Sequence, residues 1–241
     1  MFIETVPAPE AEGALTQWYE GQQKAWGFLP EYAGCFSSRP DVGLAWANLN
    51  LTIRGGMDRR RFELATVAAA MTLRSTYCAV AHATFLRDTC GDGAALEALS
   101  SGQGLSEQDA AIVEFASHVA RDASTVTQAD IDALHAVGLS DADVADLVFA
   151  VSARAFFTKV LDGLGARLDP ELVARFTPEA MEPLVVGNPP LNADANPSPG
   201  SVTTRLGSDA GHDPSGQLPG VVSPPSTTGS SARSAKLSCG R

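Results

Sequence analysis

The residue types in the stretch from Glu63 to His82 are those that carry acid–base and thiol chemistry. Cys78 and His82 are four positions apart, so on a helix they share one face and lie one turn from each other. An imidazole beside a cysteine can accept the thiol proton or hold the thiolate as an ion pair, and the thiolate is the reactive form of the sulfur. This spacing predicts a reactive cysteine, with His82 as its base and charge partner.

The serine three positions before Cys78 adds a second effect. If the helical pattern is interrupted around Ser75, this residue is a suitable N-cap and Cys78 becomes the third residue of a new helix. The unpaired backbone N–H groups and the positive end of the helix dipole at that position favour negative charge on the sulfur. We therefore expect a lowered pKa for Cys78 and a raised pKa for His82.

Glu63 is a candidate for orienting His82, on one geometric condition. On a single unbroken helix Glu63 would lie about 22 Å from Cys78, because fifteen residues each add about 1.5 Å. The carboxylate can reach His82 only if the chain turns near Ser75 or if another subunit supplies it. The break that places Cys78 at a helix start is thus also needed to recruit Glu63.

The elements around these residues have a helical pattern almost throughout residues 10–180. Ala and Leu are frequent, β-branched runs are absent, and helix stop signals recur at sensible intervals. We expect an all-α fold of several compact helices. The expected boundaries are a helix over 10–26 closed by Gly27, a short helix over 31–37, a helix from Asp41 to Gly55, and helices starting after caps at Ser106, Thr127 and Ser140.

Composition narrows the class of protein. The chain has 241 residues and a formal net charge of −11, which argues against a nucleic-acid partner. No apolar run approaches the roughly 18 residues that a membrane span needs, and the four cysteines show no framework spacing, which is typical of a reducing compartment. We expect an acidic cytoplasmic protein without a membrane or nucleic-acid partner.

The composition changes near residue 183. Pro, Gly and Ser dominate from there to the end, and apolar residues become sparse and aperiodic. Such a segment cannot bury enough surface to offset its ordering entropy. The sequence predicts a helical domain over residues 1–180 and a low-complexity disordered tail over 183–241.

The spacing of the candidate residues resembles that of a known family. Glu63, eleven intervening residues, then Ser75-x-x-Cys78-x-x-x-His82 is similar to the alkylhydroperoxidase D-like core of the carboxymuconolactone decarboxylase family, whose redox branch has Glu, eleven residues and Cys-x-x-Cys-x-x-x-His. The resemblance covers roughly residues 10–175. It implies an all-helical fold that assembles into trimers or hexamers, and peroxide reduction by a cysteine pair to which Glu and His relay protons.

Carried over residue by residue, Cys78 matches the second cysteine of that pair, His82 the relay histidine and Glu63 the relay carboxylate. Tyr77 occupies a position that is a second histidine in some members. The departure is Ser75, which stands where the first cysteine would be, so no disulfide can form within the motif. Cys90 would lie about 18 Å along a straight helix from Cys78, beyond bridging distance.

The leading functional hypothesis is therefore a one-cysteine, peroxiredoxin-type antioxidant enzyme. Cys78 would attack a hydroperoxide, and an external thiol would resolve the sulfenic acid that forms. His82 and Glu63 would handle the proton, and Ser75 would act as a cap and hydrogen-bond donor.

Other functional hypotheses for these residues stay open. His82 with Glu63 could perform acid–base chemistry of the lactone-decarboxylase type, with Cys78 only lining the pocket. A non-enzymatic oligomeric helical protein with a degenerate site is a third reading. Cys78 and His82 could supply two zinc ligands, but no second pair stands at a suitable spacing, so we expect no metal and no cofactor.

Overall fold

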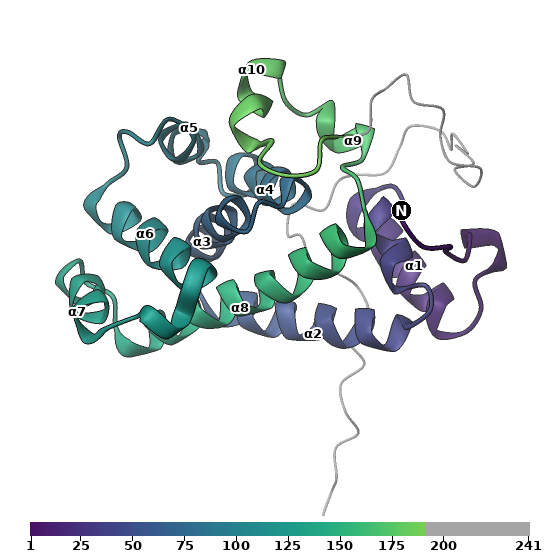
Figure 1. Ribbon diagram of the computed structural model, residues 1–241, viewed down its shortest axis with the longest axis horizontal. Coiled ribbons are helices and arrows are strands. Elements are labelled where there is room, and N and C mark those ends of the chain that lie inside the picture. The colour runs from purple at the N-terminus through teal and green to yellow at the C-terminus, as the bar shows by residue number, and fades with distance from the viewer. Residues whose placement is uncertain (191–241) are drawn as a thin grey trace, which may run out of the picture.

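The computed structural model describes residues 1–190, and every regular element in that range is helical (Figure 1). The all-α prediction is confirmed. The helices are α1 (Ala14–Trp26), α2 (Pro40–Gly56), α3 (Arg59–Thr72), α4 (Thr76–Thr84), α5 (Gly93–Ser101), α6 (Glu107–Asp122), α7 (Gln128–Ala136), α8 (Asp141–Leu164), α9 (Pro170–Val173) and α10 (Pro178–Met181). Short 3₁₀ segments are Ala8–Glu10, Glu31–Phe36, Ala123–Thr125 and Glu182–Leu184, and a π-helical turn, Phe85–Thr89, follows α4.

The boundaries of these helices follow the signals in the sequence. Gly27 closes α1 with a left-handed backbone, at φ 81°. The side chain of Ser106 caps α6, and capping boxes at Thr127 and Ser140 open α7 and α8. Helix α1 begins at Ala14 rather than at residue 10, because Ala8–Glu10 forms a separate 3₁₀ turn.

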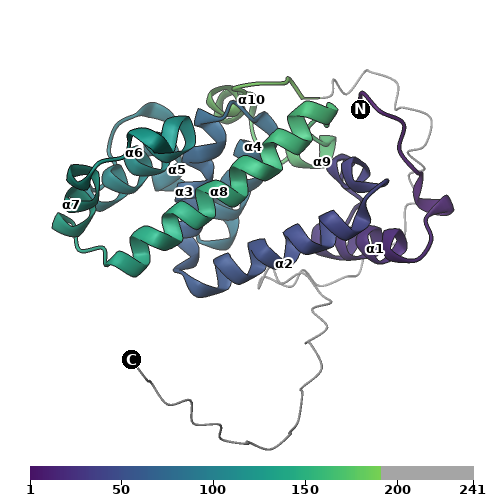
Figure 2. The ribbon, with the colours of Figure 1, turned by 60° about the horizontal axis from the view of Figure 1, so that its bottom comes forward.

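Helix α3 lies at the centre of the molecule. Its residues 62–70 are all buried, so it has no solvent-facing side along that stretch. Helices α4, α6 and α8 pack around it, and Figures 1 and 2 both show it enclosed by them. A helix buried on all sides is built mainly from small and apolar side chains, which explains the alanine-rich sequence there. The central position also makes a charged residue on α3 a candidate for function rather than for solubility.

The two longest helices, α2 and α8, lie against one another along one side of the core (Figure 2). Trp46 of α2 stacks on Phe157 of α8, with ring centroids 3.8 Å apart and planes inclined by 13°. This contact fixes the two helices side by side, and it forms one wall of the region in which the candidate residues lie.

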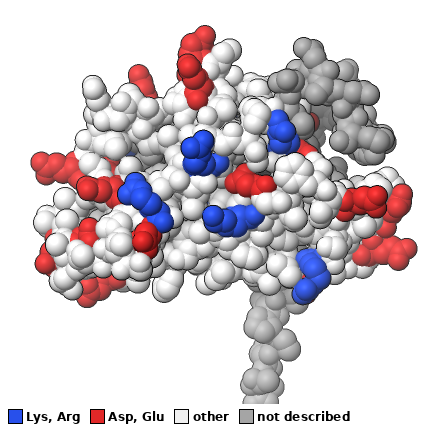
Figure 3. All heavy atoms as spheres, viewed as in Figure 1, with Lys and Arg blue, Asp and Glu red and all other residues white. Residues whose placement is uncertain are grey.

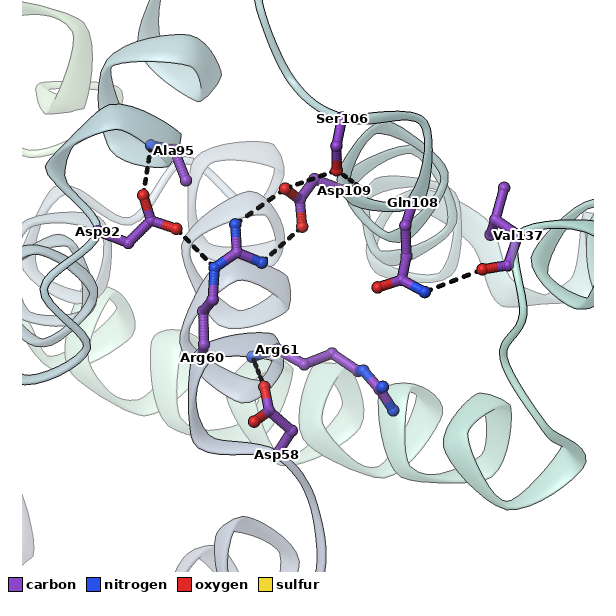
Figure 4. A network of polar contacts seen from close by, with 9 residues as sticks. All are labelled: Asp58, Arg60, Arg61, Asp92, Ala95, Ser106, Gln108, Asp109 and Val137. Atoms are coloured by element: carbon purple, nitrogen blue, oxygen red, sulfur yellow. Dashed lines mark hydrogen bonds and ion pairs between the residues drawn. The ribbon is translucent and has the colours of Figure 1, made fainter.

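A network of ion pairs joins α3 to α5 and α6 (Figure 4). The Arg60 guanidinium donates from Nε to Asp92 at 2.5 Å, and from Nη1 and Nη2 to Asp109 at 2.7 and 2.8 Å. Asp92 is itself the N-cap of α5, and Asp109 accepts a hydrogen bond from Ser106, the N-cap of α6. One arginine therefore holds the starts of two helices against the central helix.

The helical domain extends past the boundary expected at residue 183. Leu184 is fully buried, the Gly187 N–H donates to Thr76 Oγ1 at 2.9 Å, and the Asn188 amide donates to Asp162 at 3.4 Å. Residues 183–190 therefore pack on α4 and α8 instead of starting a disordered tail, because Leu184 and its neighbours supply apolar contacts that the Pro-rich composition obscures. The rest of the predicted tail, 191–241, lies outside the described residues.

Charge is unevenly distributed over the face shown in Figure 3. Acidic side chains gather at the margins of this face, whereas the fewer lysine and arginine side chains lie closer to its middle.

Within residues 1–190, no helix is long and apolar enough to cross a membrane.

Candidate functional site

The chain breaks between α3 and α4 where the sequence predicts it. Arg74 adopts a left-handed conformation, with φ 60°, and Ser75 follows as the N-cap residue of α4. The Ser75 N–H reaches back to the Ala70 carbonyl at 2.9 Å, as in a helix C-terminal motif that reverses the chain. Cys78 is consequently the third residue of α4. The Ser75 side chain, however, makes no capping hydrogen bond, so its expected role as a side-chain cap is not realised.

This break brings Glu63 and His82 together. The Glu63 Oε2 atom lies 2.5 Å from His82 Nδ1, and its Oε1 atom accepts from Arg59 Nε at 2.6 Å. Glu63 is fully buried, so each of its oxygens is satisfied by one cationic or proton-donating partner. The contact is made within one chain, and no second subunit is needed to supply the carboxylate.

The electrostatics of this triad leave Glu63 ionised and His82 neutral. Burial would raise the pKa of Glu63, but His82 and Arg59 outweigh it and hold this pKa below its ordinary value. Burial and then the nearby Arg154 guanidinium lower the pKa of His82 to about 4, against the opposing effect of Glu63. Nδ1 therefore donates its proton to Glu63, and Nε2 is left as the basic atom of the ring.

Cys78 lies beside an arginine. The Arg154 guanidinium, from α8, donates from Nη1 toward Cys78 Sγ over 3.6 Å. Both side chains are almost fully buried, with 1% of Cys78 and 2% of Arg154 exposed. The Arg154 guanidinium also faces the rings of Trp46 and Phe157, at 5.8 and 5.4 Å from their centroids.

The expected pKa shifts of Cys78 and His82 are reversed in this structure. Burial raises the pKa of the Cys78 thiol above its ordinary value of 9.0, although Arg154 and the Ser75 hydroxyl act to lower it. The pKa of His82 is lowered rather than raised. The reason is the same for both groups: Arg154 and Ser75 favour the thiolate and Glu63 favours the imidazolium, but removal of water from the site disfavours the charged forms more strongly.

Tyr77 points away from the Glu63–His82 pair. Its hydroxyl donates to the Asp169 carboxylate, and its ring meets Tyr32 edge-on at 5.5 Å. Asp169 also accepts the Glu31 N–H at 2.9 Å. Tyr77 thus belongs to a second buried polar cluster, next to Cys78 in sequence but engaged with a different set of groups.

The cysteines among the described residues form no disulfide. Cys35 and Cys78 are buried and Cys90 is partly exposed, and all three are free thiols. Cys35 lies 3.7 Å from the sulfur of Met1, and burial raises its pKa to about 12. Within residues 1–190 no group of three or more His, Cys, Asp or Glu is placed to hold a metal ion.

Two functional candidates were not found from the sequence. Arg154 is 76 residues from Cys78, and Arg59 was not distinguished from its neighbours Arg60 and Arg61. Arg59 has the i, i+4 relation to Glu63 that is typical of helical ion pairs, so that signal was available. Nothing in the local pattern singles out Arg154 except an arginine within an otherwise apolar helical stripe.

Comparison with solved structures supports the fold. A protein described as an alkylhydroperoxidase AhpD core, an uncharacterized peroxidase-related protein from Ralstonia eutropha JMP134, superposes with a TM-score of 0.61 at 22% identity, over 71% of this chain and 93% of the other. The chain has the alkylhydroperoxidase D-like fold. An uncharacterized peroxidase-related protein from Silicibacter sp. TM1040 shares this alkylhydroperoxidase D-like fold, with a TM-score of 0.61 at 19% identity over 70% and 93% of the two chains.

A third similar structure is that of a debrominase. The debrominase Bmp8, as a cysteine-to-alanine variant in complex with 2,3,4-tribromopyrrole, gives a TM-score of 0.62 at 14% identity over 76% of this chain and 97% of the other. No family sequence model and no curated protein matches the chain.

Proposed function

We propose that this protein is an enzyme that reduces hydroperoxides through Cys78, with an external thiol as the reductant. The observation that carries the proposal is the arrangement of three helices: α4 carries Cys78 and, four residues later, His82, α3 supplies the Glu63 carboxylate at 2.5 Å from His82, and α8 supplies Arg154 at 3.6 Å from the Cys78 sulfur. A nucleophile, a base held by a carboxylate and a nearby cation are the parts that thiol chemistry requires.

The Cys78 thiol gives its proton to Nε2 of His82, and the thiolate attacks the distal oxygen of the hydroperoxide, breaking the O–O bond. The sulfur is oxidised to the sulfenic acid, and the departing alkoxide takes the proton back from His82 and leaves as the alcohol. Arg154 stabilises the negative charge on sulfur and on the departing oxygen during this step.

Resolution then requires two molecules of an external thiol. The first condenses with the sulfenic acid and releases water, leaving a mixed disulfide on Cys78. The second attacks that mixed disulfide, releases the external disulfide and regenerates the Cys78 thiol. Ser75 cannot take the place of the first external thiol, since a hydroxyl forms no disulfide.

The closed conformation keeps this thiol protonated. Because the pKa of Cys78 is raised and the pKa of His82 is lowered, moving the proton from the thiol to the imidazole is unfavourable in this conformation. Burial is the largest cause of both shifts, so admission of water or substrate brings the two values together, while Arg154 continues to favour the thiolate and Glu63 continues to favour the imidazolium. A conformational opening is therefore part of the proposed cycle, which agrees with the 1% exposure of Cys78.

The test is peroxide turnover in the presence of a low-molecular-weight thiol. We expect Cys78→Ser to abolish turnover of hydrogen peroxide and of an organic hydroperoxide, and Cys90→Ser, which alters a partly exposed cysteine, to leave it unchanged. Equal rates for the wild type and Cys78→Ser would rule out the proposal. A mixed disulfide on Cys78, trapped by omitting excess thiol and located by mass spectrometry, would establish the resolution step.

A second candidate is acid–base chemistry at His82, favoured by one specific observation. His82 is neutral near pH 7, its Nδ1 is fixed by Glu63, and the neighbouring thiol is protonated, so Nε2 is a base that needs no redox partner. Activity on an unsaturated lactone acid that persists in Cys78→Ser and is lost in His82→Gln would support this reading over peroxide reduction.

We also propose that the protein works as a homo-oligomer, a trimer or hexamer. The support is an apolar surface on the adjacent helices α2 and α8, where Leu49, Phe149 and Phe156 are 52%, 54% and 42% exposed. Large exposed apolar side chains in one region are typical of an interface. Light scattering of the wild type and of Phe149→Asp measures this directly: a monomeric wild type would exclude the assembly.

A further inference from the structure

We propose that Arg154 forms a binding site for a small carboxylate beside Cys78, so that the substrate of this site is an anion. The inference rests on the proposed function, because it names the substrate class of the same site: a hydroperoxide, or another reactive molecule, that carries a single carboxylate.

The charge of Arg154 has no counter-ion among the described residues. Among residues 1–190 no carboxylate forms an ion pair with this guanidinium, whereas Arg59, Arg60 and Arg61 are each paired with Asp or Glu. Arg154 is only 2% exposed, so water does not solvate it either. A buried charge without a counter-ion costs several kcal/mol, and folded proteins keep such a group only where something compensates for it.

Two arginine side chains of the site have buried N–H donors without a hydrogen-bond partner. The Nε atom of Arg154 is buried and has no hydrogen-bond partner, and neither has the Nη2 atom of Arg59. Buried donors of this kind are nearly always satisfied in folded proteins, so their presence marks a position that a ligand fills. An acceptor that approached Nε of Arg154 would be beside the Cys78 sulfur, which lies 3.6 Å from Nη1 of the same guanidinium.

The charged groups around Cys78 favour binding of an anion. Arg59 and Arg154 are cationic, Glu63 is ionised, and His82 and the Cys78 thiol are neutral in the closed state, so these five groups together carry one net positive charge. One monoanion neutralises it.

The groups next to Arg154 favour a carboxylate over a phosphate dianion as the bound anion. The Arg154 guanidinium is flanked by the rings of Trp46 and Phe157; the Trp46 indole N–H already donates to the Ala153 carbonyl and Phe157 has no donor, so neither ring adds one for a phosphate dianion. A planar carboxylate with one charge and an apolar body matches one guanidinium between aromatic rings. The whole chain has a formal net charge of −11, so a positive site is a local inversion of charge that selects anions there and repels them elsewhere.

The experiment compares two alkylating reagents of similar size that differ in charge, iodoacetate and iodoacetamide. Site-specific rates for Cys78 are measured by peptide mass spectrometry, and the iodoacetate-to-iodoacetamide ratio is divided by that of free N-acetylcysteine. Because both reagents attack the same thiolate, any change in the thiol pKa cancels in this ratio. Cys90, partly exposed on the acidic chain, is the internal control.

We expect the normalised ratio for Cys78 to be about tenfold higher in the wild type than in Arg154→Gln, a difference of roughly 1.4 kcal/mol. Arg154→Lys, which keeps the charge, should retain most of the preference, and the ratio for Cys90 should not change in either variant. A normalised ratio near one in the wild type, or an equal ratio in Arg154→Gln, would overturn the proposal.

A second measurement covers the case in which Cys78 reacts with neither reagent. Formate is titrated into the wild type while the His82 ring signals and the Arg154 Nε–H signal are followed by NMR. Saturable shifts that Arg154→Gln abolishes support the carboxylate site, and linear or absent shifts overturn it. The two proposals fail separately: a flat reagent ratio with intact Cys78-dependent peroxidase activity removes only the anion site, and a charge-selective ratio with turnover in Cys78→Ser removes only the peroxidase.

Discussion

The Nη1 atom of Arg154 lies 3.6 Å from Sγ of Cys78, while no carboxylate among residues 1–190 pairs with that guanidinium. Helix α8 thus delivers a cation to a thiol on α4 across the core, at a position where neither side chain meets bulk water. The consequence is that the ionisation of Cys78 depends on two opposed effects, burial and the arginine, and that each can be changed separately.

Substitution of Arg154 should raise the pKa of Cys78 further. The guanidinium lowers this pKa against the effect of burial, so Arg154→Gln removes the largest opposing contribution. The pH dependence of alkylation by the neutral reagent iodoacetamide measures it: the wild-type midpoint should lie above 9.0, and the Arg154→Gln midpoint should be higher still. Arg154→Lys should fall between them, and a lower midpoint in Arg154→Gln would contradict the assignment.

Removal of the Glu63 charge should lower the pKa of His82 below its value of about 4. The carboxylate is the group that raises this pKa, and without it only burial and the two arginines act on the ring. Titration of the His82 ring signals by NMR in Glu63→Gln measures the change. Glu97→Gln, on the exposed face of α5, is the matched control. If the ring of Glu63→Gln titrated at a higher pH than in the wild type, the Glu63–His82 contact would not have the role assigned to it.

The sequence was sufficient for the parts of this site that are local. The turn at Ser75, the position of Cys78 as third residue of α4 and the approach of Glu63 to His82 all follow from spacing and helix geometry. Burial is not local: it depends on the helices packed around α3 and α4, and it reverses the pKa shifts predicted from the Cys78–His82 spacing and from the helix position of Cys78. Arg154 was missed for the same reason, since tertiary packing alone brings residues 78 and 154 together.

The ends of the fold show a similar division. Capping residues predicted the starts of α6, α7 and α8, because a cap acts through its own backbone neighbours. Composition predicted the loss of structure from residue 183, but Leu184 is buried and Gly187 bonds to Thr76. A few apolar residues in a Pro-rich stretch suffice to hold it when the domain already offers a matching surface.

The second buried cluster predicts a pH-dependent stability. Burial raises the pKa of Asp169 from 3.8 to about 7, against the hydrogen bonds from Tyr77 and the Glu31 N–H. The folded state therefore binds the proton more tightly than the unfolded state. The resulting stabilisation is complete below pH 3.8 and is lost as the pH rises to about 7, with a change of up to roughly 4 kcal/mol.

Denaturant unfolding between pH 4 and 8 measures this contribution. The slope of unfolding free energy against pH should be less negative in Asp169→Asn than in the wild type across that interval. Asp132→Asn, on the exposed surface of α7, serves as the control and should follow the wild-type slope. Identical slopes for the wild type and Asp169→Asn would show that Asp169 is already ionised at pH 4.

Residues 185–190 should detach when Gly187 is given a side chain. A Cβ atom at this position would lie 1.8 Å from the Arg74 carbonyl oxygen, a backbone atom that cannot move aside without disturbing the start of α4. We expect Gly187→Ala to lower the free energy of unfolding by about 1–3 kcal/mol and to make this segment susceptible to limited proteolysis. Gly55→Ala, at an exposed glycine of α2 with open space around it, should show neither effect. Unchanged stability and protease resistance in Gly187→Ala would mean that the close approach to Arg74 is easily relieved.

Restoring a second thiol at the start of α4 should change the way in which Cys78 is resolved. Ser75 is fully buried, its hydroxyl influences the Cys78 thiol, and the two residues stand as N-cap and third residue of one helix. The Ser75→Cys variant therefore carries two thiols at the spacing of a redox-active pair. After one equivalent of peroxide, we expect it to lose two hydrogens by mass, in an intramolecular disulfide, where the wild type instead accumulates a sulfenic acid that a dimedone probe traps. Thr76→Ser, which alters the adjacent position and adds no sulfur, is the control and should behave as the wild type. If the variant remained trappable by dimedone to the same extent, the introduced thiol could not reach Cys78 and the serine would not be the feature that prevents an internal disulfide.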